Sequence, residues 1–389
     1  MIPYADFTFF GLMLYPVLPA LLFGWFGRRI QSWLPIITGF MLVVLYRDLA
    51  DVQPQRTLRE IWLVLAYAAF QWLLTQSFLR LRQRVNQRWL FYSALLLGLT
   101  PLMISKFTPL LAPQALWGFL GISYVTFRSL DVIFGVQDGL LKGLPTVPYL
   151  TYLFFFPTIS AGPVDRYRRF LQDWQRPRTR DDFLLDLDHA VDRIFTGFLY
   201  KFILAALIKR YWLDPTAAAT GWLPTLSYMY AYSFYLFFDF AGYSAFAIGF
   251  SYIFGIHTPE NFNRPFLARD VKDFWNRWHI SLSTWFRDHV YMRFLIAAAK
   301  GRWFKHKYTS SYLGAFLLFG LMGLWHGPQL HYILYGLYHA VWFASHDWFS
   351  RWNKQHKIWG DSPAWRALSI LLTFHLICFG FLIFSGRII

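Results

Sequence analysis

The segment DFWNRWHISLSTWFRDHVYMRF, residues 273–294, gathers tryptophans, histidines, arginines and carboxylates inside a hydrophobic chain. Wound as one α-helix, it predicts an apolar stripe with a polar stripe beside it. The apolar stripe consists of Trp275, Trp278, Leu282 and Trp285, and the polar stripe of Asn276, His279, Ser283 and Arg287. Such a helix is typical of a membrane interface. Because the polar stripe has no lysine and mixes several hydrogen-bonding groups, it also suits the lining of a substrate site.

A second candidate for chemistry is His326, in GLMGLWHGPQLHYILYGLYHA, residues 320–340. It ends an apolar run and precedes Gly327 and Pro328, where a helix ends or kinks. An ionisable residue in a membrane segment is a functional candidate, and a desolvated, neutral histidine suits a general base. The alternative is a histidine that binds a backbone carbonyl freed by Pro328.

A possible metal site in the same region has only one kind of ligand. His331, Tyr335 and His339 follow one another at steps of four and share a helix face. No carboxylate or cysteine joins them, so we expect no bound metal.

The third candidate is FFFPTISAGPVDRYRRF, residues 154–170, in which Pro157, Gly162 and Pro163 exclude a plain helix. Ser160 lies here at membrane depth, just before the arginines Arg166, Arg168 and Arg169. Non-helical backbone at that depth is tolerated in a protein interior or a wet cavity. The alternative is a proline-kinked helix end. The stretch GIHTPENFNRPF, residues 255–266, leads into the tryptophan and histidine segment and is best interpreted as a connecting turn.

The elements that must position these residues are membrane helices. Of 389 residues, 56% are hydrophobic and 15% are charged, against about 25% charged in ordinary soluble domains. We expect about eleven membrane helices plus several short ones, in a single domain spanning residues 1–389. The apolar segments are 7–25, 33–46, 61–79, 89–104, 116–134, 146–160, 194–212, 223–240, 241–256, 311–325, 330–345 and 365–385.

The chain carries a net charge of +16, and the positions of its basic residues predict a topology. Basic runs at 27–29, 80–88 and 165–180 should all be cytoplasmic. Three apolar segments, 89–104, 116–134 and 146–160, lie between the last two runs. Three crossings would put these runs on opposite sides of the membrane, so one segment does not cross. We favour 146–160, because Pro148 and Pro157 interrupt it, while Arg128 and Asp131 of the other candidate can pair on one helix face.

The stretches WNRWHISLSTWFRD, GLWHG, FFPTISAGPVDRYRRF and PENFNRPF together resemble the membrane-bound O-acyltransferase family. The resemblance covers most of the chain. It places His279 and His326 at the two polar positions that matter in this family. A histidine at the first position is similar to the D-alanyl-transferring and alginate-acetylating branches, and PTISAGPVDRYRRF favours the D-alanyl branch, which modifies teichoic acids.

The resemblance implies an all-α ring of tilted helices around a thin centre with a tunnel, in a bacterial plasma membrane. The donor would be a D-alanyl thioester on the phosphopantetheine arm of a small acidic carrier protein, with no cofactor bound to this chain. The acceptor side would be teichoic acid or a helper membrane protein. By the same resemblance, His326 would be the general base, and His279 would orient the donor or stabilise the oxyanion.

The resemblance also suggests roles for the surrounding residues. Ser283 would hold His279 in one tautomer. We expect the tunnel to be lined by Asn276, Ser283, Trp275, Trp278, Trp285 and Ser160. The basic cytoplasmic face should attract the carrier, docked beside Arg166, Arg168 and Arg169, and also anionic lipid.

Two other functions remain open at this point. One is an O-acetyltransferase for extracellular polysaccharide, within the same family. The other is a transporter or channel whose intramembrane His, Arg and Asp form a proton or substrate path. The lack of a fixed-period repeat weighs against the transporter.

Overall fold

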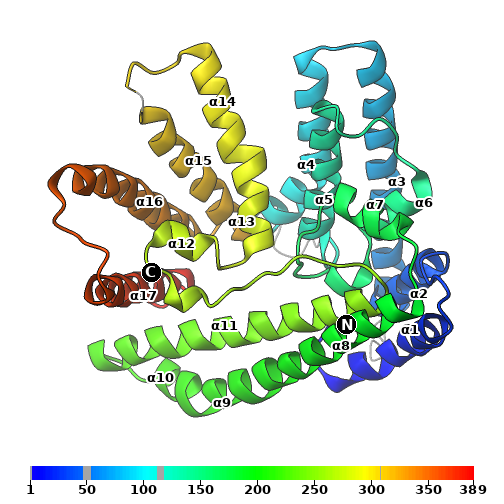
Figure 1. The fold of residues 1–389 in the computed structure, drawn as a ribbon, viewed down its shortest axis with the longest axis horizontal. Coiled ribbons are helices and arrows are strands. Elements are labelled where there is room, and N and C mark those ends of the chain that lie inside the picture. The colour runs from blue at the N-terminus through cyan, green and yellow to red at the C-terminus, as the bar shows by residue number, and fades with distance from the viewer. Residues whose placement is uncertain (1, 47–53, 112–117, 307) are drawn as a thin grey trace. The chain divides into compact units, whose positions relative to one another are not determined.

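The computed structural model describes residues 2–46, 54–111, 118–306 and 308–389 (Figure 1). Regular structure in these ranges is helical, apart from one isolated β-bridge between Phe262 and Trp278. The prediction of an all-helical protein is therefore confirmed.

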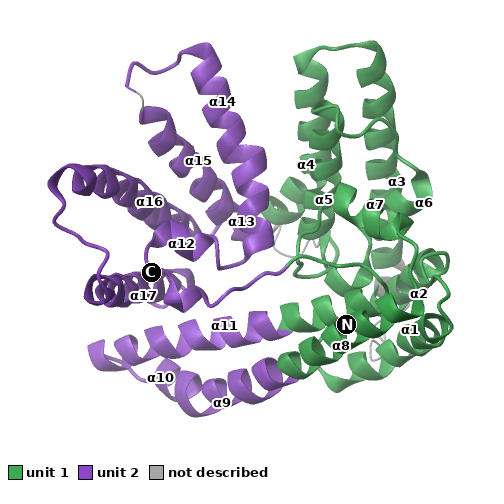
Figure 2. Ribbon diagram, viewed as in Figure 1, with its two compact units in different colours: residues 1–197, 243–259 green, residues 198–242, 260–389 purple. Residues whose placement is uncertain are grey.

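The chain forms two compact units, coloured separately in Figure 2. Unit 1 comprises residues 1–197 and 243–259, and unit 2 comprises residues 198–242 and 260–389. The expectation of one domain over residues 1–389 stays a prediction.

Unit 1 is built around a helical hairpin, α3 and α4, with α5 packed on both. Gly98 on α4 allows this packing, because a Cβ there would meet Leu130 of α5 at 3.2 Å and Leu74 of α3 at 3.4 Å. The helices that lie wholly or mostly in unit 1 are α1 Phe7–Trp25, α2 Leu34–Tyr46, α3 Pro54–Arg84, α4 Arg88–Leu111, α5 Ile122–Gln137, α6 Thr146–Leu153, η1 Phe156–Thr158, α7 Tyr167–Gln175 and α8 Arg180–Phe198.

Unit 2 contains the candidate histidines, and its strongest packing joins α15, α16 and α17 in sequence. Gly323 and Gly336 lie where α15 meets α16, and a Cβ at either would collide with backbone of the other helix. The elements of unit 2 are η2 Leu199–Ala205, α9 Ala206–Ile208, η3 Lys209–Leu213, α10 Asp214–Ala218, η4 Pro265–Leu267, α12 Val271–Trp275, α13 Ile280–Phe286, η5 Arg287–Tyr291, α14 Met292–Gly301, α15 Thr309–His326, α16 Leu330–His356 and α17 Pro363–Phe384.

One helix, α11 Trp222–Ile253, contributes to both units. The sequence divided this stretch into segments 223–240 and 241–256, but the structure has one helix of 32 residues. Nothing in FDFAGYS, residues 238–244, breaks a helix, because its single glycine is tolerated in a helix interior.

The described residues contain five helices long and apolar enough to cross a membrane, namely α1, α3 from Arg59, α4 up to Thr108, α11 and α17, with α2 as a shorter apolar helix. The chain is therefore a multi-pass membrane protein. The count of about eleven, the ring and the tunnel stay predictions. In the disputed segment 146–160, α6 has only 8 residues. It rises about 12 Å, against about 30 Å for a bilayer core, so this segment forms no spanning helix.

Candidate active site

The tryptophan and histidine segment is broken at its centre, so the expectation of one amphipathic helix over 273–294 is wrong. Helix α12 ends at Trp275, and α13 begins only at Ile280. Between them His279 has φ +44° and ψ +50°, in the left-handed region that non-glycine residues seldom adopt. The helix then widens to a π-helical turn at η5 before α14. Periodicity alone could not show this break, because Asn276–His279 contains neither glycine nor proline.

The break is held by the connector that precedes it. The backbone N–H of Asn263 donates to the Arg277 carbonyl at 2.9 Å, and the N–H of Ile280 donates to the Asn261 carbonyl at 3.0 Å. The side chain of Asn261 is fully buried, and its Oδ1 accepts from Ser281 Oγ at 2.6 Å. The PENFNRPF stretch is therefore a brace that replaces helical hydrogen bonds at the break, and no longer only a connecting turn.

His279 is 5% exposed, with its ring edge-to-face against Phe240 at 4.7 Å. Its Nε2 has no hydrogen-bond partner among the described residues. Ser283 does not hold the ring as expected, because its Oγ donates to the Trp278 carbonyl at 3.1 Å. A buried imidazole nitrogen without a partner is uncommon in proteins, and here His189 and His339 have one as well, so this nitrogen of His279 has hydrogen-bonding capacity that the described residues do not use.

The apolar stripe predicted from the sequence is real, although no single helix carries it. Trp275, Trp278, Leu282 and Trp285 are all buried. Trp278 packs between Phe262 and Phe381, with ring centroids 5.1 and 4.8 Å away. The polar stripe is divided by the break, since Asn276 and Arg287 are exposed while His279 is buried.

His326 is the last residue of α15, and the helix ends there as predicted. Its ring is partly exposed and lies against Phe384 at 4.9 Å and Tyr332 at 5.7 Å. His326 belongs to unit 2, as His279 does; burial first, and then the charge of His326, lower the pKa of His279 to about 3. The structure thus places the two histidines that the sequence singled out in the same unit.

A third histidine of unit 2 is His339 on α16, which the sequence marks only as one member of a possible metal site. It is 1% exposed, and the Trp275 indole N–H donates to its Nδ1 at 3.4 Å. Its ring lies 4.6 Å from that of Tyr335, which in turn lies 6.4 Å from His326. In the described part of the chain no three His, Cys, Asp or Glu side chains gather closely enough to hold a metal.

In unit 1, the broken segment 154–160 is organised by Arg128 of α5, which is 1% exposed. Its guanidinium donates to the carbonyls of Leu153 at 2.9 Å and Thr158 at 2.9 Å, and also to the Thr158 hydroxyl. Non-helical backbone leaves carbonyls unpaired, and one buried guanidinium satisfies several of them. The pairing expected between Arg128 and Asp131 is wrong, because Asp131 binds Arg166 at 2.7 Å instead.

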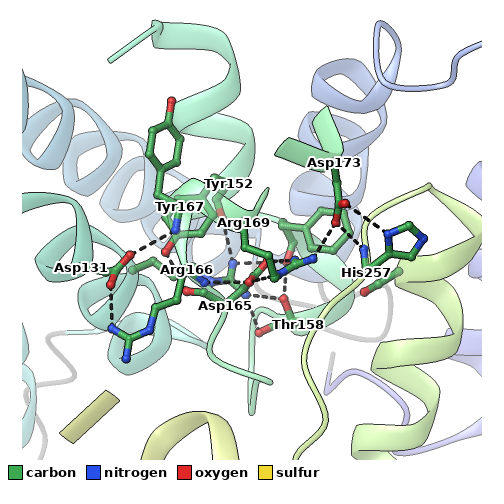
Figure 3. Close-up of polar contacts among 12 residues, drawn as sticks. Asp131, Tyr152, Thr158, Asp165, Arg166, Tyr167, Arg169, Asp173 and His257 are labelled. Carbon is green, nitrogen blue, oxygen red and sulfur yellow. Dashed lines mark hydrogen bonds and ion pairs between the residues drawn. The ribbon is translucent and has the colours of Figure 1, made fainter. Parts of the chain in front are cut away.

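The predicted arginine cluster follows directly, and Figure 3 shows that two of its members are neutralised from within. Arg166 pairs with Asp131, and Arg169 forks between Asp165 and Asp173. Arg168 is exposed and makes no ion pair with any residue that the structure describes. Only Arg168 of the three presents an uncompensated charge.

His257 belongs to the same network, and sequence reasoning missed it (Figure 3). Its ring nitrogens lie 3.2 Å from Asp173 and 2.8 Å from Asp186, and Asp186 also pairs with Arg178 at 2.8 Å. Hydrogen bonds with Asp173 and then Asp186 raise the pKa of His257 to about 9. The connector after α11 is thereby held to α7 and α8 by a protonated histidine.

Ser160, predicted at a tunnel wall, is partly exposed within unit 1. Its Oγ lies 2.8 Å from the hydroxyl of Tyr243, which also accepts from the Ala161 N–H at 3.1 Å. Unit 1 therefore holds Ser160 and the arginines, and unit 2 holds the histidines.

Comparison with known proteins gives consistent matches. A family described as "MBOAT, membrane-bound O-acyltransferase family" matches residues 134–386. A teichoic acid D-alanyltransferase of Bacillus subtilis is 44% identical over 100% of this chain and 98% of its own length. One from Lacticaseibacillus rhamnosus is 39% identical over 99% and 97%. A probable alginate O-acetylase of Pseudomonas aeruginosa is 34% identical over 69% of this chain and 49% of its own length.

Proposed function

This chain belongs to the membrane-bound O-acyltransferase family and is an acyltransferase, and from that premise we propose that it transfers D-alanine towards teichoic acid. The donor is a D-alanyl thioester on the phosphopantetheine arm of an acidic carrier protein at the cytoplasmic side. The acceptor is teichoic acid itself or a helper membrane protein. Relatives named for this transfer match the chain end to end, which supports the D-alanyl branch.

The proposal rests on two observations in unit 2. His326 is a partly exposed histidine at a helix end, and His279 is a buried histidine with a ring nitrogen that is unpaired among the described residues. A thioester-to-ester transfer needs a base for the acceptor hydroxyl and a donor for the oxyanion. His326 and the unpaired nitrogen of His279 fit these two needs. The strained backbone at His279 fits a functional site, where such strain is often found.

The transfer follows from these roles. His326 takes the proton of the acceptor hydroxyl as its oxygen attacks the thioester carbonyl. The neutral ring of His279, in the tautomer with its N–H on the nitrogen that faces the substrate, donates a hydrogen bond to the oxygen that becomes negative. The C–S bond then breaks, the ester C–O bond remains, and the proton on His326 passes to the leaving thiolate. The activated thioester drives the reaction, so no covalent intermediate on this chain is needed.

The remaining predicted residues retain their proposed places around a tunnel through a thin centre in a ring of about eleven helices. Burial of Trp275, Trp278 and Trp285 supports a rigid aromatic wall for the histidines. Ser283 and Ser160 are partly exposed, as tunnel-lining residues should be, while the exposed Asn276 would lie at its edge.

The proposed carrier dock is sharpened by the ion pairs in unit 1. Because Asp131 neutralises Arg166 and two aspartates neutralise Arg169, Arg168 is the member left to attract an acidic partner. Arg166 and Arg169 would instead keep the docking segment in shape. Electrostatic attraction of this kind steers a partner more than it fixes the final affinity.

A polysaccharide O-acetyltransferase is the second candidate, because the alginate O-acetylase match covers 69% of this chain. The deciding experiment uses the purified full-length protein in vesicles with radiolabelled D-alanyl carrier thioester and teichoic acid. We expect labelled ester on the acceptor only when protein, carrier and acceptor are all present. Transfer from an acetyl donor but not from the D-alanyl carrier would establish the second candidate. Passage of free D-alanine without ester formation would show a transporter instead.

A further inference from the structure

Unit 2 contains a cavity of about 770 Å³ that the proposed transfer does not use. It lies between α16 and α17 and reaches the start of α12. Pockets of about 300–1,000 Å³ commonly hold small organic ligands. Helix α17 is one of the candidate spans, so the cavity lies beside a membrane helix.

The mouth of the cavity is charged. The charged residues of its lining are Arg269, Lys354 and Arg366 with Asp361 and Asp270. Arg366 pairs with Asp361 at 2.9 Å, and Asp270 caps α12 by accepting from the Lys272 and Asp273 N–H groups. Arg269 and Lys354 are exposed, and neither side chain forms an ion pair with a carboxylate of the described residues, so the mouth keeps an excess of positive charge.

The mouth is also held open by specific contacts. Asn353 on α16 donates to the Trp359 carbonyl and accepts from the Trp359 N–H, both at 2.7 Å. The Trp359 indole N–H donates to Ser369 Oγ of α17 at 2.9 Å. The turn between the two helices is therefore fastened to both, and the cavity between them is preformed.

Away from the mouth the walls become apolar. Trp342, Phe349, Leu372, Leu376 and Ile377 line this part. Leu372 is 48% exposed and Trp342 36%, so the apolar wall is open along the helices' outer faces. An elongated hydrocarbon chain fits such a wall, whereas a ligand rich in amides would leave polar groups unpaired there.

The charge pattern assigns a side of the membrane to the mouth. Between residues 351 and 366 the chain carries Arg351, Lys354, Lys357 and Arg366 against one carboxylate, Asp361. Basic residues concentrate on the cytoplasmic side, where anionic lipids supply a negative surface. Basic pockets between membrane helices on that side bind phosphate-bearing headgroups.

We propose that this cavity binds an anionic phospholipid of the cytoplasmic leaflet. Its phosphodiester lies between Arg269 and Lys354, and one acyl chain lies along Trp342, Leu372 and Leu376. This site is separate from the acyl-transfer chemistry, and its test needs no turnover.

The test is native mass spectrometry and thermal unfolding of the full-length protein in detergent, with added phosphatidylglycerol, phosphatidylcholine, glycerol phosphate or pantetheine phosphate. We expect phosphatidylglycerol to bind and to raise the unfolding temperature. Arg269→Gln with Lys354→Gln should weaken this binding about tenfold or more, at about one kilocalorie per basic residue near an anionic lipid. Lys305→Gln with Lys357→Gln removes the same charge from exposed positions that do not line the cavity, and should leave binding unchanged.

A second pair of variants tests the apolar wall. Thr373→Phe fills the cavity, whereas Leu371→Phe places the same aromatic ring on the same helix at an exposed residue outside it. Loss of lipid binding in the first variant only supports the proposal. Equal binding of phosphatidylcholine would overturn the role of the charged mouth. Equally tight binding of glycerol phosphate would make this a free-phosphate site, and equally tight binding of pantetheine phosphate a donor-arm site; either result overturns the lipid.

Discussion

Two arginines and a histidine of unit 1 are paired with carboxylates, whereas the buried candidate histidine of unit 2 keeps a ring nitrogen without a hydrogen-bond partner among the described residues. Arg166, Arg169 and His257 each meet one or two carboxylates. In unit 2, by contrast, the His279 ring packs against Phe240, and its Nε2 is buried with no hydrogen-bond partner among the described residues. Paired buried charges hold the surrounding backbone in place, while an unpaired buried nitrogen has hydrogen-bonding capacity left for a substrate. We infer that the paired groups of unit 1 maintain the structure and that the histidines of unit 2 take part in the acyl transfer.

The sharpest test of this contrast is His326→Ala. If His326 is the base, transfer should fall by about 10²–10⁴-fold, the usual contribution of a general base. Folding and carrier binding should be unchanged, which size-exclusion chromatography and a binding assay would check alongside the transfer assay. Full activity in a well-expressed variant would remove the assignment. A variant that fails to fold would show that His326 serves the structure.

His279 gives the next largest effect. We expect His279→Ala to be severely impaired and His279→Asn to keep more activity, because an amide retains hydrogen bonding and tolerates left-handed backbone. His279→Gly is the matched control, since it relaxes the backbone while removing the ring. Activity should rank Asn above both Ala and Gly. A folded Asn variant as inactive as Ala would mean that His279 carries a proton.

The PENFNRPF connector, which supports the helix break at His279, should matter for both stability and activity. Asn261→Ala leaves the buried Ser281 hydroxyl without its acceptor, at a cost of about 1–3 kcal/mol in unfolding free energy. Thermal unfolding and the transfer assay should both show the loss. Asn263→Ala, at an exposed side chain in the same connector, should change neither. Equal effects of the two variants would show that the connector has no special contact at Asn261.

The network of unit 1 should reveal itself through pH. The pKa of His257 is raised from about 6.5 to about 9, so protonated His257 stabilises the fold. That stabilisation is complete below about pH 6.5 and is lost as pH rises through about 9, amounting to the order of 2 kcal/mol. His257→Gln should remove this part of the pH dependence in unfolding measured between pH 6 and 9.5. An unchanged slope would show that the two aspartates are held by other groups.

The smallest expected effect concerns the carrier. Arg168→Glu should weaken carrier binding mainly at low salt, where charges are least screened. Arg84→Glu makes the same change at an exposed arginine on the same predicted face. Adding Arg169→Glu should lower stability as well, because Arg169 holds two aspartates. If the Arg168 variant binds the carrier with unchanged affinity at low and at high salt, Arg168 would serve only to set the membrane topology.

Several helices could be predicted from hydrophobic runs, because α1, α2, α15 and α17 begin and end within a few residues of their apolar segments. The break at His279 could not, since long-range backbone bonds to Asn261 and Asn263 override helical periodicity. His257 was missed for a similar reason: its two carboxylates are 84 and 71 residues away in sequence. The choice of His279 and His326 came from the family resemblance, and the structure adds the surroundings of each ring.

The carbonyls that Arg128 binds have a consequence for biosynthesis. They belong to residues 24 to 30 positions further along the chain, so the guanidinium has no partners when α5 leaves the ribosome. At about 5–20 residues per second, these partners arrive a few seconds later. A charge exposed to lipid in the meantime is costly, so we expect α5 to stay at the translocon until Thr158 has emerged. Nascent chains stalled before and after this point should differ in how readily α5 crosslinks to lipid.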